Sequence, residues 1–414
     1  MTATHAEPDI VTSDSVVAGP SPRHALLIAF LVIASTVSWR PSTLYEGGTD
    51  PVVLAKAALS GLALGAALLA RGAQLRPVPL SAMPIWLLTS FLATTMFGAY
   101  ASGLMMVSAV IVVRVIILAS VGYLFVRAFG FETAARCWLT AMASVAMLAA
   151  VTGLPTIASG RLRGGIPPIH PNELAIYCVF PALGLIWSFV NGRNKPWHNA
   201  LLLALLVTLW ATGSRTSLGA AVLGAVIIVA SIRRPTPGRF VALVFAAATF
   251  LFIALGTDLL WNILLRGGRE NLTGVASRSI GWSAALDYAE NGWGQWAGVG
   301  IALREIPVQG QYWDTQLLDS SWISAYVQTG RLGVILLIVW ICWIIWSVRL
   351  IPKPLRSLAV GTFAAVLLRS VTESGLVDST VDFFTFWLLT LACATATARR
   401  WRHSPLSTRN RPES

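Results

Sequence analysis

The stretch GLMMVSAVIVVRVIILASVGYLFV, residues 103–126, decides the class of this chain. It contains one charged residue, Arg114, among 24 positions, and a membrane span needs about 20 mostly apolar residues to cross the hydrocarbon layer. In the full sequence 56% of residues are hydrophobic and 12% are charged, against roughly 25% charged in an ordinary soluble domain. The chain is therefore expected to be an integral membrane protein.

Other apolar stretches follow one another along the chain. Together with the first they lie at about 24–39, 51–70, 80–98, 103–126, 134–154, 172–190, 198–212, 216–231, 240–257, 322–347, 356–371 and 380–398. The first is short, and the pair around Ser214 is separated only by a Gly-Ser-Arg turn, so eleven or twelve spans fit the pattern. We expect an all-α polytopic transmembrane bundle over residues 24–398, with about 12 spans. One long, partly helical hydrophilic loop, 258–321, is expected between the ninth and tenth spans.

The positively charged residues indicate how the chain is oriented. Counted over alternate connections, 18 of the 30 lysines and arginines fall on the side that carries both termini. Cytoplasmic loops are enriched in Lys and Arg, so both termini are expected in the cytoplasm and the 258–321 loop outside the cytoplasmic membrane. Residues 1–23 are polar, which predicts a disordered cytoplasmic tail and not a signal peptide. Residues 399–414 are expected to form a basic cytoplasmic tail.

Several function classes do not fit the sequence. The net charge of +12 is scattered through short loops instead of being gathered on a soluble face, which argues against nucleic-acid binding. Neither a GxxxxGK[ST] sequence nor a glycine-rich strand-to-helix turn is present, so ATP is not the expected energy source. The four cysteines and five histidines lack the spacing of a disulfide framework or a metal site. No metal or other cofactor is therefore expected.

The arginines on the expected outer side are unusual for a membrane protein and require an explanation. The long loop and its edge carry Arg266, Arg269, Arg278, Arg304 and Arg331. Because the outer face of a membrane protein is normally poor in basic residues, this cluster indicates an anionic ligand.

The loop before the sixth expected span has a similar character. It reads SGRLRGGIPPIHPNE at residues 159–173 and places Arg161 and Arg163 close to His170 and Asn172. Such a loop can approach a phosphate closely, and Asn172 is expected to cap the helix that follows. An ordinary polar turn with a capping asparagine is the alternative interpretation.

Two arginines interrupt apolar segments. Arg215, in TGSRTS at residues 212–217, lies near the expected outer surface, where it could bind a ligand or anchor a helix end. Arg114 lies about ten residues inside its span and is expected to form a structural ion pair.

The long loop also has internal order. Residues 259–265 are apolar enough to lie in the membrane interface. Ser277 is expected to begin a helix in which Arg278 and Trp282 share a face. Trp293 and Trp296, in a glycine-rich segment, are candidates for stacking on sugar rings, and an interfacial aromatic belt is the alternative interpretation, slightly favoured for either residue alone.

These segments together resemble the O-antigen ligase and polymerase superfamily. The resemblance is carried by GRLRGG followed by HPNE, then TGSR, LTGVASR ending at Arg278, DSSWISAYVQTGRLG at residues 319–333, and TESGL at residues 372–376. It covers about residues 155–390. The first five spans share with the superfamily only their hydropathy and carry no motif.

The resemblance implies a metal-independent glycosyltransferase that works on the outer face of the cytoplasmic membrane. Its donor would be a glycan linked through a diphosphate to a polyprenol, and its acceptor another lipid-linked glycan or a lipid core sugar. Arginines of such enzymes hold the diphosphate leaving group, and by motif position Arg215 and Arg278 match the two functional arginines of the family. A chain-length regulator or export proteins are possible partners.

One departure bears on the type of enzyme. Ligases of this superfamily carry a His, followed by Asn, eleven residues before the glycine that opens the next span, and the residue eleven before Gly330 here is Asp319. The candidate base is thus a carboxylate, which favours a polymerase over a ligase. The related peptidoglycan polymerases of the shape, elongation and division family are similar in using an outer-face Asp. A helix N-cap is the alternative role for Asp319.

The predicted mechanism follows from charge. Guanidinium groups of Arg215 and Arg278 stabilise the departing diphosphate, and Asp319 accepts the proton of the attacking hydroxyl, with inversion at the anomeric carbon. The expected substrate contacts are Arg161, Arg163, His170, Asn172, Arg266, Arg269, Trp282, Trp293 and Trp296. A transporter or flippase of lipid-linked sugars is an alternative from another class, but its halves would show a repeat, and none is found. A non-catalytic scaffold would leave the outer arginines unexplained.

Overall fold

The structure is a computed structural model that describes residues 21–39, 51–75, 77–193, 195–231, 272–289, 292–307 and 315–402. For residues 272–280 and 401–402 it describes the backbone only. The ninth expected span, Arg266 and Arg269 lie outside these residues, as do residues 259–265 and most of both tails.

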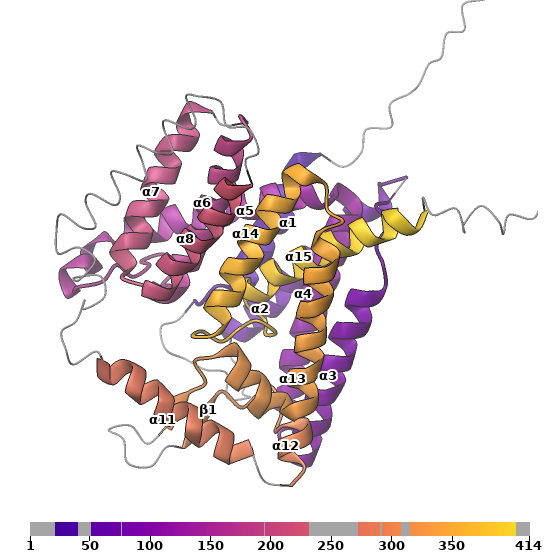
Figure 1. The fold of residues 1–414 in the computed structure, drawn as a ribbon, viewed down its shortest axis with the longest axis vertical. Coiled ribbons are helices and arrows are strands. Elements are labelled where there is room, and N and C mark those ends of the chain that lie inside the picture. Colours follow the sequence, from indigo (N-terminus) through magenta and orange to yellow (C-terminus); the bar gives the residue numbers. More distant parts are fainter. Residues whose placement is uncertain are drawn as a thin grey trace, which may run out of the picture.

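The described chain is almost entirely helical, as expected (Figure 1). Its elements are α1 Pro22–Thr36, α2 Pro51–Gly72, α3 Met83–Ala101, α4 Met105–Phe129, α5 Phe131–Gly153, the 3-10 helix η1 Leu154–Ser159, α6 Pro171–Val190, α7 Pro196–Thr212, α8 Arg215–Ala230, α11 Leu272–Ala289, α12 Gly294–Ala297, β1 Glu305–Pro307, β2 Thr315–Leu317, α13 Ser321–Val348, α14 Lys353–Ser370 and α15 Val381–Arg402. Proline in the first turn starts α1, α3, α6, α7 and α14, where its fixed φ suits the helix and its missing N–H costs nothing.

Seven of the described helices are long and apolar enough to cross a membrane: α2, α3, α4, α5, α6, α13 and α15. The helices α1, α7 and α8 are apolar but shorter. Each of the expected spans other than the ninth coincides with a helix. The chain therefore has the helices of a polytopic membrane protein, and twelve spans remain a prediction.

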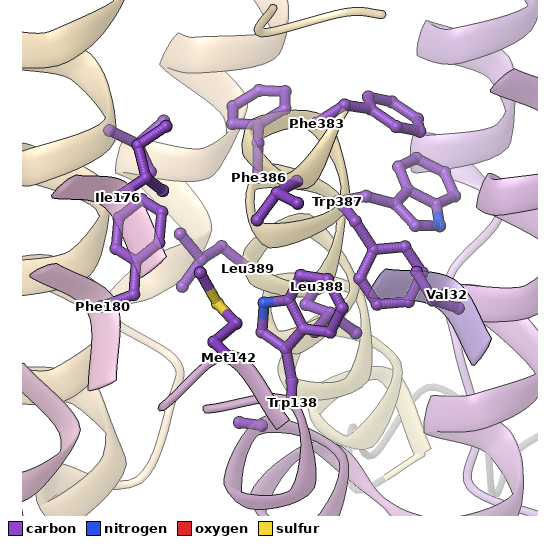
Figure 2. Close-up of a cluster of buried hydrophobic side chains, with 14 of the residues drawn as sticks. Val32, Trp138, Met142, Ile176, Phe180, Phe383, Phe386, Trp387, Leu388 and Leu389 are labelled. Carbon is purple, nitrogen blue, oxygen red and sulfur yellow. The ribbon is translucent and has the colours of Figure 1, made fainter. Parts of the chain in front are cut away.

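Helix α15 forms the centre of the bundle. Its Phe386 and Trp387 pack against Trp340 of α13, with ring centroids 5.1 and 5.9 Å apart, and its Phe384 packs against Trp138 of α5 at 4.5 Å. Figure 2 shows the side chains of α15 pointing to different sides of the helix, with Trp138 on one of them. The indole N–H of Trp387 donates to the carbonyl of Ala119 in α4 at 2.8 Å. Because lipid offers no hydrogen-bond partners, a buried indole needs a partner inside the protein. This hydrogen bond joins α15 to α4.

Helices α8 and α14 pack unusually closely because each has a glycine at the crossing. A Cβ added to Gly224 would lie 2.9 Å from the carbonyl oxygen of Gly361, and one added to Gly361 would lie 2.8 Å from that of Gly224. Small residues at membrane helix crossings let the backbones approach in this way. The close crossing brings the start of α8 next to the end of α14.

The described part of the long loop packs on the first turns of α13. Figure 1 shows α11 and α12 beyond the end of the bundle at which α13 begins. A small apolar core joins Ala285 and Ala289 of α11 to Ile306 of β1 and Val327 of α13. The two strands pair antiparallel, with Ile306 opposite Gln316. Helix α11 begins at Leu272, so the predicted start at Ser277 was wrong by five residues.

Helix α13 is broken at Gly330, whose φ is +64°. A Cβ on Gly330 would lie 2.3 Å from the backbone carbon of Trp296, so α12 packs directly against the break. The carbonyls of Val327 and Gln328 accept hydrogen bonds from the N–H groups of Val299 and Gly300 at 2.9 and 3.0 Å. The segment before the break thus belongs to the loop region, while the longer segment after it has the length of a span.

Candidate functional site

Polar side chains from distant segments meet where α6, α8, α13 and α15 begin and α14 ends. Arg161 Nη2 donates a hydrogen bond to Asn172 Oδ1 at 2.9 Å, and Asn172 Nδ2 donates to Glu373 Oε1 at 2.8 Å. The backbone carbonyl of Glu373 accepts from the Ser321 hydroxyl at 2.8 Å. One series of hydrogen bonds therefore links the loop before α6, the loop after α14 and the start of α13. The name polar network is used below for these four residues together with Ser217, Arg369 and Asp382.

Arg369 is the charged centre of the polar network and is only 5% exposed. Its Nη1 donates to Ser217 Oγ at 2.8 Å and to the Asn172 carbonyl at 3.2 Å. Its Nε lies 3.5 Å from Asp382 Oδ1, and its Nη2 lies 4.0 Å from Glu373 Oε2. A buried guanidinium in an apolar bundle is tolerated only when it is paired, and here α6, α8, α15 and the loop after α14 supply the partners.

Arg161 also fixes the turn that carries Arg215. Its Nε donates to the carbonyl of Thr212 at 2.8 Å, and the neighbouring Leu162 N–H donates to Ala211 at 2.9 Å. Gly213 in this turn has φ +67°, and a Cβ there would lie 3.3 Å from Arg161 Nε. Arg215 is then the exposed first residue of α8. Arg161 thus holds protein groups in place, which makes it a positioning residue for the Arg215 turn.

His170, and not Asn172, caps α6. Its side chain accepts a hydrogen bond from the N–H of Asn172, with Nδ1 and N 3.4 Å apart. The prediction that Asn172 is the cap was wrong, because Pro171 starts the helix one residue earlier and the Asn172 side chain is used to cross-link segments. Burial lowers the pKa of His170, and the nearby charges of Arg161 and Arg163 lower it further. The imidazole is therefore neutral at pH 7 and can accept the N–H bond.

Asp319 is half-buried and lies just before α13. The N-cap of that helix is Ser320, so the alternative interpretation of Asp319 as the cap was wrong by one residue. Its neighbours Leu318 and Ser321 both line a cavity of about 100 Å³. Asp319 does not itself line the cavity but lies next to it in the chain, between Leu318 and Ser321.

The cavity lies between α3, α13, β2 and the loop after α14 and is partly open. Its polar lining comprises Arg304, Ser321, Ser324, Gln328, Ser374 and Asp378. Arg304 Nη2 and Asp378 Oδ2 form an ion pair at 2.6 Å. A second space of about 10 Å³ shares Ser321, Ser374 and Leu376 with it and reaches Arg369 and Asp382. The cavity and the polar network therefore adjoin at Ser321.

Some predicted contacts lie away from this cavity. Trp293 is 68% exposed and packs edge-on against Phe97 of α3 with ring centroids 6.0 Å apart. Trp296 is 46% exposed, and the guanidinium of Arg331 lies 5.4 Å from its ring centre. Neither lines the cavity.

For the other residues predicted to contact substrate, the structure gives exposure or backbone position but few side-chain contacts. Arg163 is exposed at the same end of the bundle as Arg161. Trp282 is half-buried on α11, and within the described residues its buried indole N–H has no hydrogen-bond partner. For Arg278 the structure gives only the backbone, in α11. Arg114, expected in an ion pair, donates from Nη2 to the carbonyl of Ser35 at 3.2 Å.

The sequence did not single out Arg369, Glu373 or Asp382 as site residues. Arg369 and Asp382 are lone charged residues at the ends of apolar segments, and Glu373 entered only as part of TESGL. One local signal was present: Arg369 and Glu373 are four residues apart, the spacing at which helical side chains meet. The pairing of Arg304 with Asp378 joins segments more than 70 residues apart and has no local signal.

No protein-family model matches the chain, and no curated protein is significantly similar to it. Within the described residues no group of three or more His, Cys, Asp or Glu side chains is arranged to hold a metal ion.

Proposed function

We propose that this protein is a membrane glycosyltransferase that transfers or polymerises a polyprenyl-diphosphate-linked glycan on the outer face of the cytoplasmic membrane, for surface or exopolysaccharide assembly. The observation that carries the proposal is the contact among the motif segments. Arg161 of GRLRGG, Asn172 of HPNE, Thr212 of TGSR, Ser321 of DSSW and Glu373 of TESGL are joined by direct hydrogen bonds. They are five of the six segments that carry the superfamily resemblance, the sixth being LTGVASR, and a scaffold would give them no reason to converge.

The reaction needs a site for the leaving group and a base. Polyprenyl diphosphate gains negative charge as it departs, and arginine guanidiniums stabilise such charge without a metal ion. Arg215 and Arg278 take this role. Arg163 and the neutral His170 lie on the loop before α6, whose Arg161 contacts the turn that carries Arg215. Arg161 supports the site indirectly, since it holds the turn that carries Arg215.

Asp319 is the proposed base. The hydroxyl of the acceptor attacks the anomeric carbon, its proton passes to the Asp319 carboxylate, and the bond between that carbon and the diphosphate oxygen breaks. Direct displacement inverts the anomeric configuration. A carboxylate at this position, where ligases of the superfamily carry His, favours growth of a polymer over transfer to a lipid core, so a second lipid-linked glycan is the proposed acceptor.

Deletion of the gene tests the proposal against transport of the same lipid. Loss of a polymerase leaves unpolymerised lipid-linked units in the outer leaflet, accessible to a membrane-impermeant glycan label on intact cells. Loss of a flippase leaves them in the inner leaflet, where the label reaches them only after permeabilisation. Surface polysaccharide of unchanged amount and length in the deletion strain would reject both functions.

A further inference from the structure

The cavity beside Asp319 differs in charge from the surface around Arg215. Its single arginine, Arg304, is neutralised by Asp378 at 2.6 Å, and its other polar lining groups are serines and Gln328. The surface at the polar network instead carries exposed Arg161, Arg163 and Arg215. A diphosphate is attracted to the cationic surface, whereas a cavity with balanced charge suits an uncharged polar group.

The size and lining of the cavity indicate which uncharged polar group it can bind. At about 100 Å³ it is smaller than the roughly 300–1,000 Å³ of a pocket that encloses a whole ligand. It therefore admits one ring-sized part of a larger substrate. Hydroxyl, amide and ion-pair groups share the lining with apolar side chains such as Phe91 and Leu337. A sugar ring has matching properties, with hydroxyls on its edge and C–H groups on its faces.

The polar lining is fixed before any ligand arrives. Gln328 Nε2 donates to the carbonyl of Leu303 at 2.8 Å, and Asp378 Oδ1 accepts the Ser379 N–H at 2.5 Å. The carbonyl of Arg304 accepts the N–H of Leu318 at 2.9 Å. Groups held in this way lose little freedom when a ligand binds, which favours affinity and a single orientation.

We infer that this cavity binds one uncharged sugar ring of the glycan substrate and holds it next to Asp319. The inference rests on the proposed function and deepens it by separating two subsites. The cationic surface takes the diphosphate, and the cavity takes the sugar.

The experiment measures the binding of two probes to the purified full chain. One probe is polyprenyl diphosphate without sugar, and the other is the same lipid carrying the glycan of the source cells. Ser324→Leu fills the cavity, since Ser324 lines it and is 7% exposed. Ser347→Leu is the matched control, because Ser347 is also a buried serine of α13, at 1% exposed, but does not line the cavity.

The unaltered protein is expected to bind the glycan-bearing lipid about tenfold more tightly than the bare lipid, equivalent to ~1.4 kcal/mol of ring contacts. Ser324→Leu is expected to remove this preference and leave the affinity for the bare lipid unchanged, while Ser347→Leu keeps both affinities. A preference that survives in folded Ser324→Leu, or that is absent from the unaltered protein, overturns the inference. If Ser324→Leu does not fold, Ala325→Val alters the same lining with the same expected results.

Competition with the free glycan shows whether the bound sugar ring belongs to the donor or to the acceptor. Displacement of the glycan-bearing donor identifies the ring as the donor's, and a raised KM for the acceptor alone identifies it as the acceptor's. Failure of the free glycan to compete with either substrate counts against the inference. The affinities of the two lipid probes are measured without turnover. The proposed glycosyl transfer is tested separately, and it is rejected if the protein releases no polyprenyl diphosphate.

Discussion

The centre of the bundle and its polar end bury hydrogen-bonding groups in different ways. At the centre, the indoles of Trp138 and Trp340 donate to the hydroxyls of Thr385 and Thr390 at 3.0 and 3.1 Å, and every group in these pairs is neutral. At the polar end, the charged Arg369 is buried against Asp382 and Glu373. Neutral pairs stabilise packing at little cost, whereas buried charges are expensive even when paired. The comparison indicates that the polar pairs at the centre stabilise the fold, whereas the charged groups at the polar end are expensive for stability and are therefore candidates for function.

The largest effect is expected where the polar end meets the cavity. Asp319→Asn keeps the size of the side chain but removes the proton acceptor, so the transfer rate should fall about 10²–10⁴-fold with donor binding retained. The check is the rate of polymer formation at saturating donor. Glu132→Gln, which alters an exposed carboxylate paired with Arg136 and Arg193, is the control and should leave the rate unchanged. Polymer growth at the normal rate in Asp319→Asn would remove the residue from the mechanism.

The next effect tests whether the polar end depends on its buried charge. Arg369→Met leaves two half-buried carboxylates without their cation and should lower the free energy of unfolding by about 3 kcal/mol. Arg136→Met removes an arginine that is 67% exposed and paired with Glu132 at 2.9 Å, and should cost about 0–1 kcal/mol. Thermal unfolding in detergent compares the two variants. Equal losses of stability would contradict the distinction between the polar end and the surface.

A smaller effect is expected at the centre. Thr385→Val leaves the buried indole N–H of Trp138 without its acceptor and should cost about 1–3 kcal/mol. The double variant Trp138→Phe and Thr385→Val removes both partners, so its loss of stability should be smaller than the sum of the losses in the two single variants. The same unfolding measurement applies. If the double variant is less stable than the sum of the single changes predicts, the bond between the two side chains is not what stabilises this contact.

The smallest effect concerns pH. The pKa of His170 is lowered from the usual value of 6.5, so the unfolded chain takes up a proton before the folded protein does as pH falls. The stabilisation by the neutral cap is therefore present above about pH 6.5 and is lost as pH falls toward the lowered pKa. His170→Asn keeps a capping side chain without this titration. The unfolding temperature of the unaltered protein should drop more between pH 7.5 and 5.5 than that of His170→Asn, and parallel drops would count against the cap.

Most of the helices could be predicted from the sequence because apolar length is a local property. The expected spans coincide with helices wherever the structure describes them, including the one around Arg114. Boundaries were less predictable. Leu272, His170 and Ser320 start or cap their helices in place of Ser277, Asn172 and Asp319. At each boundary several polar residues compete, and packing decides among them.

The candidate site was predictable only in part. The motif order pointed to Arg161, Asn172 and Asp319, and the structure brings Arg161 and Asn172 into direct contact. Arg369 was missed because its partners come from α6, α8, α15 and the loop after α14, and no short window of sequence contains them together. Trp293, predicted to stack on a sugar ring, is exposed and packs edge-on against Phe97 of α3 away from the cavity, so its role stays a prediction.

The most direct test is the release of free polyprenyl diphosphate by the purified protein, supplied with labelled polyprenyl-diphosphate glycan and a metal chelator but no ATP. We predict one free polyprenyl diphosphate for every glycan transferred, and loss of this release in Asp319→Asn and Arg215→Ala. Absence of release from the unaltered, folded protein, with the donor recovered intact, would contradict the account.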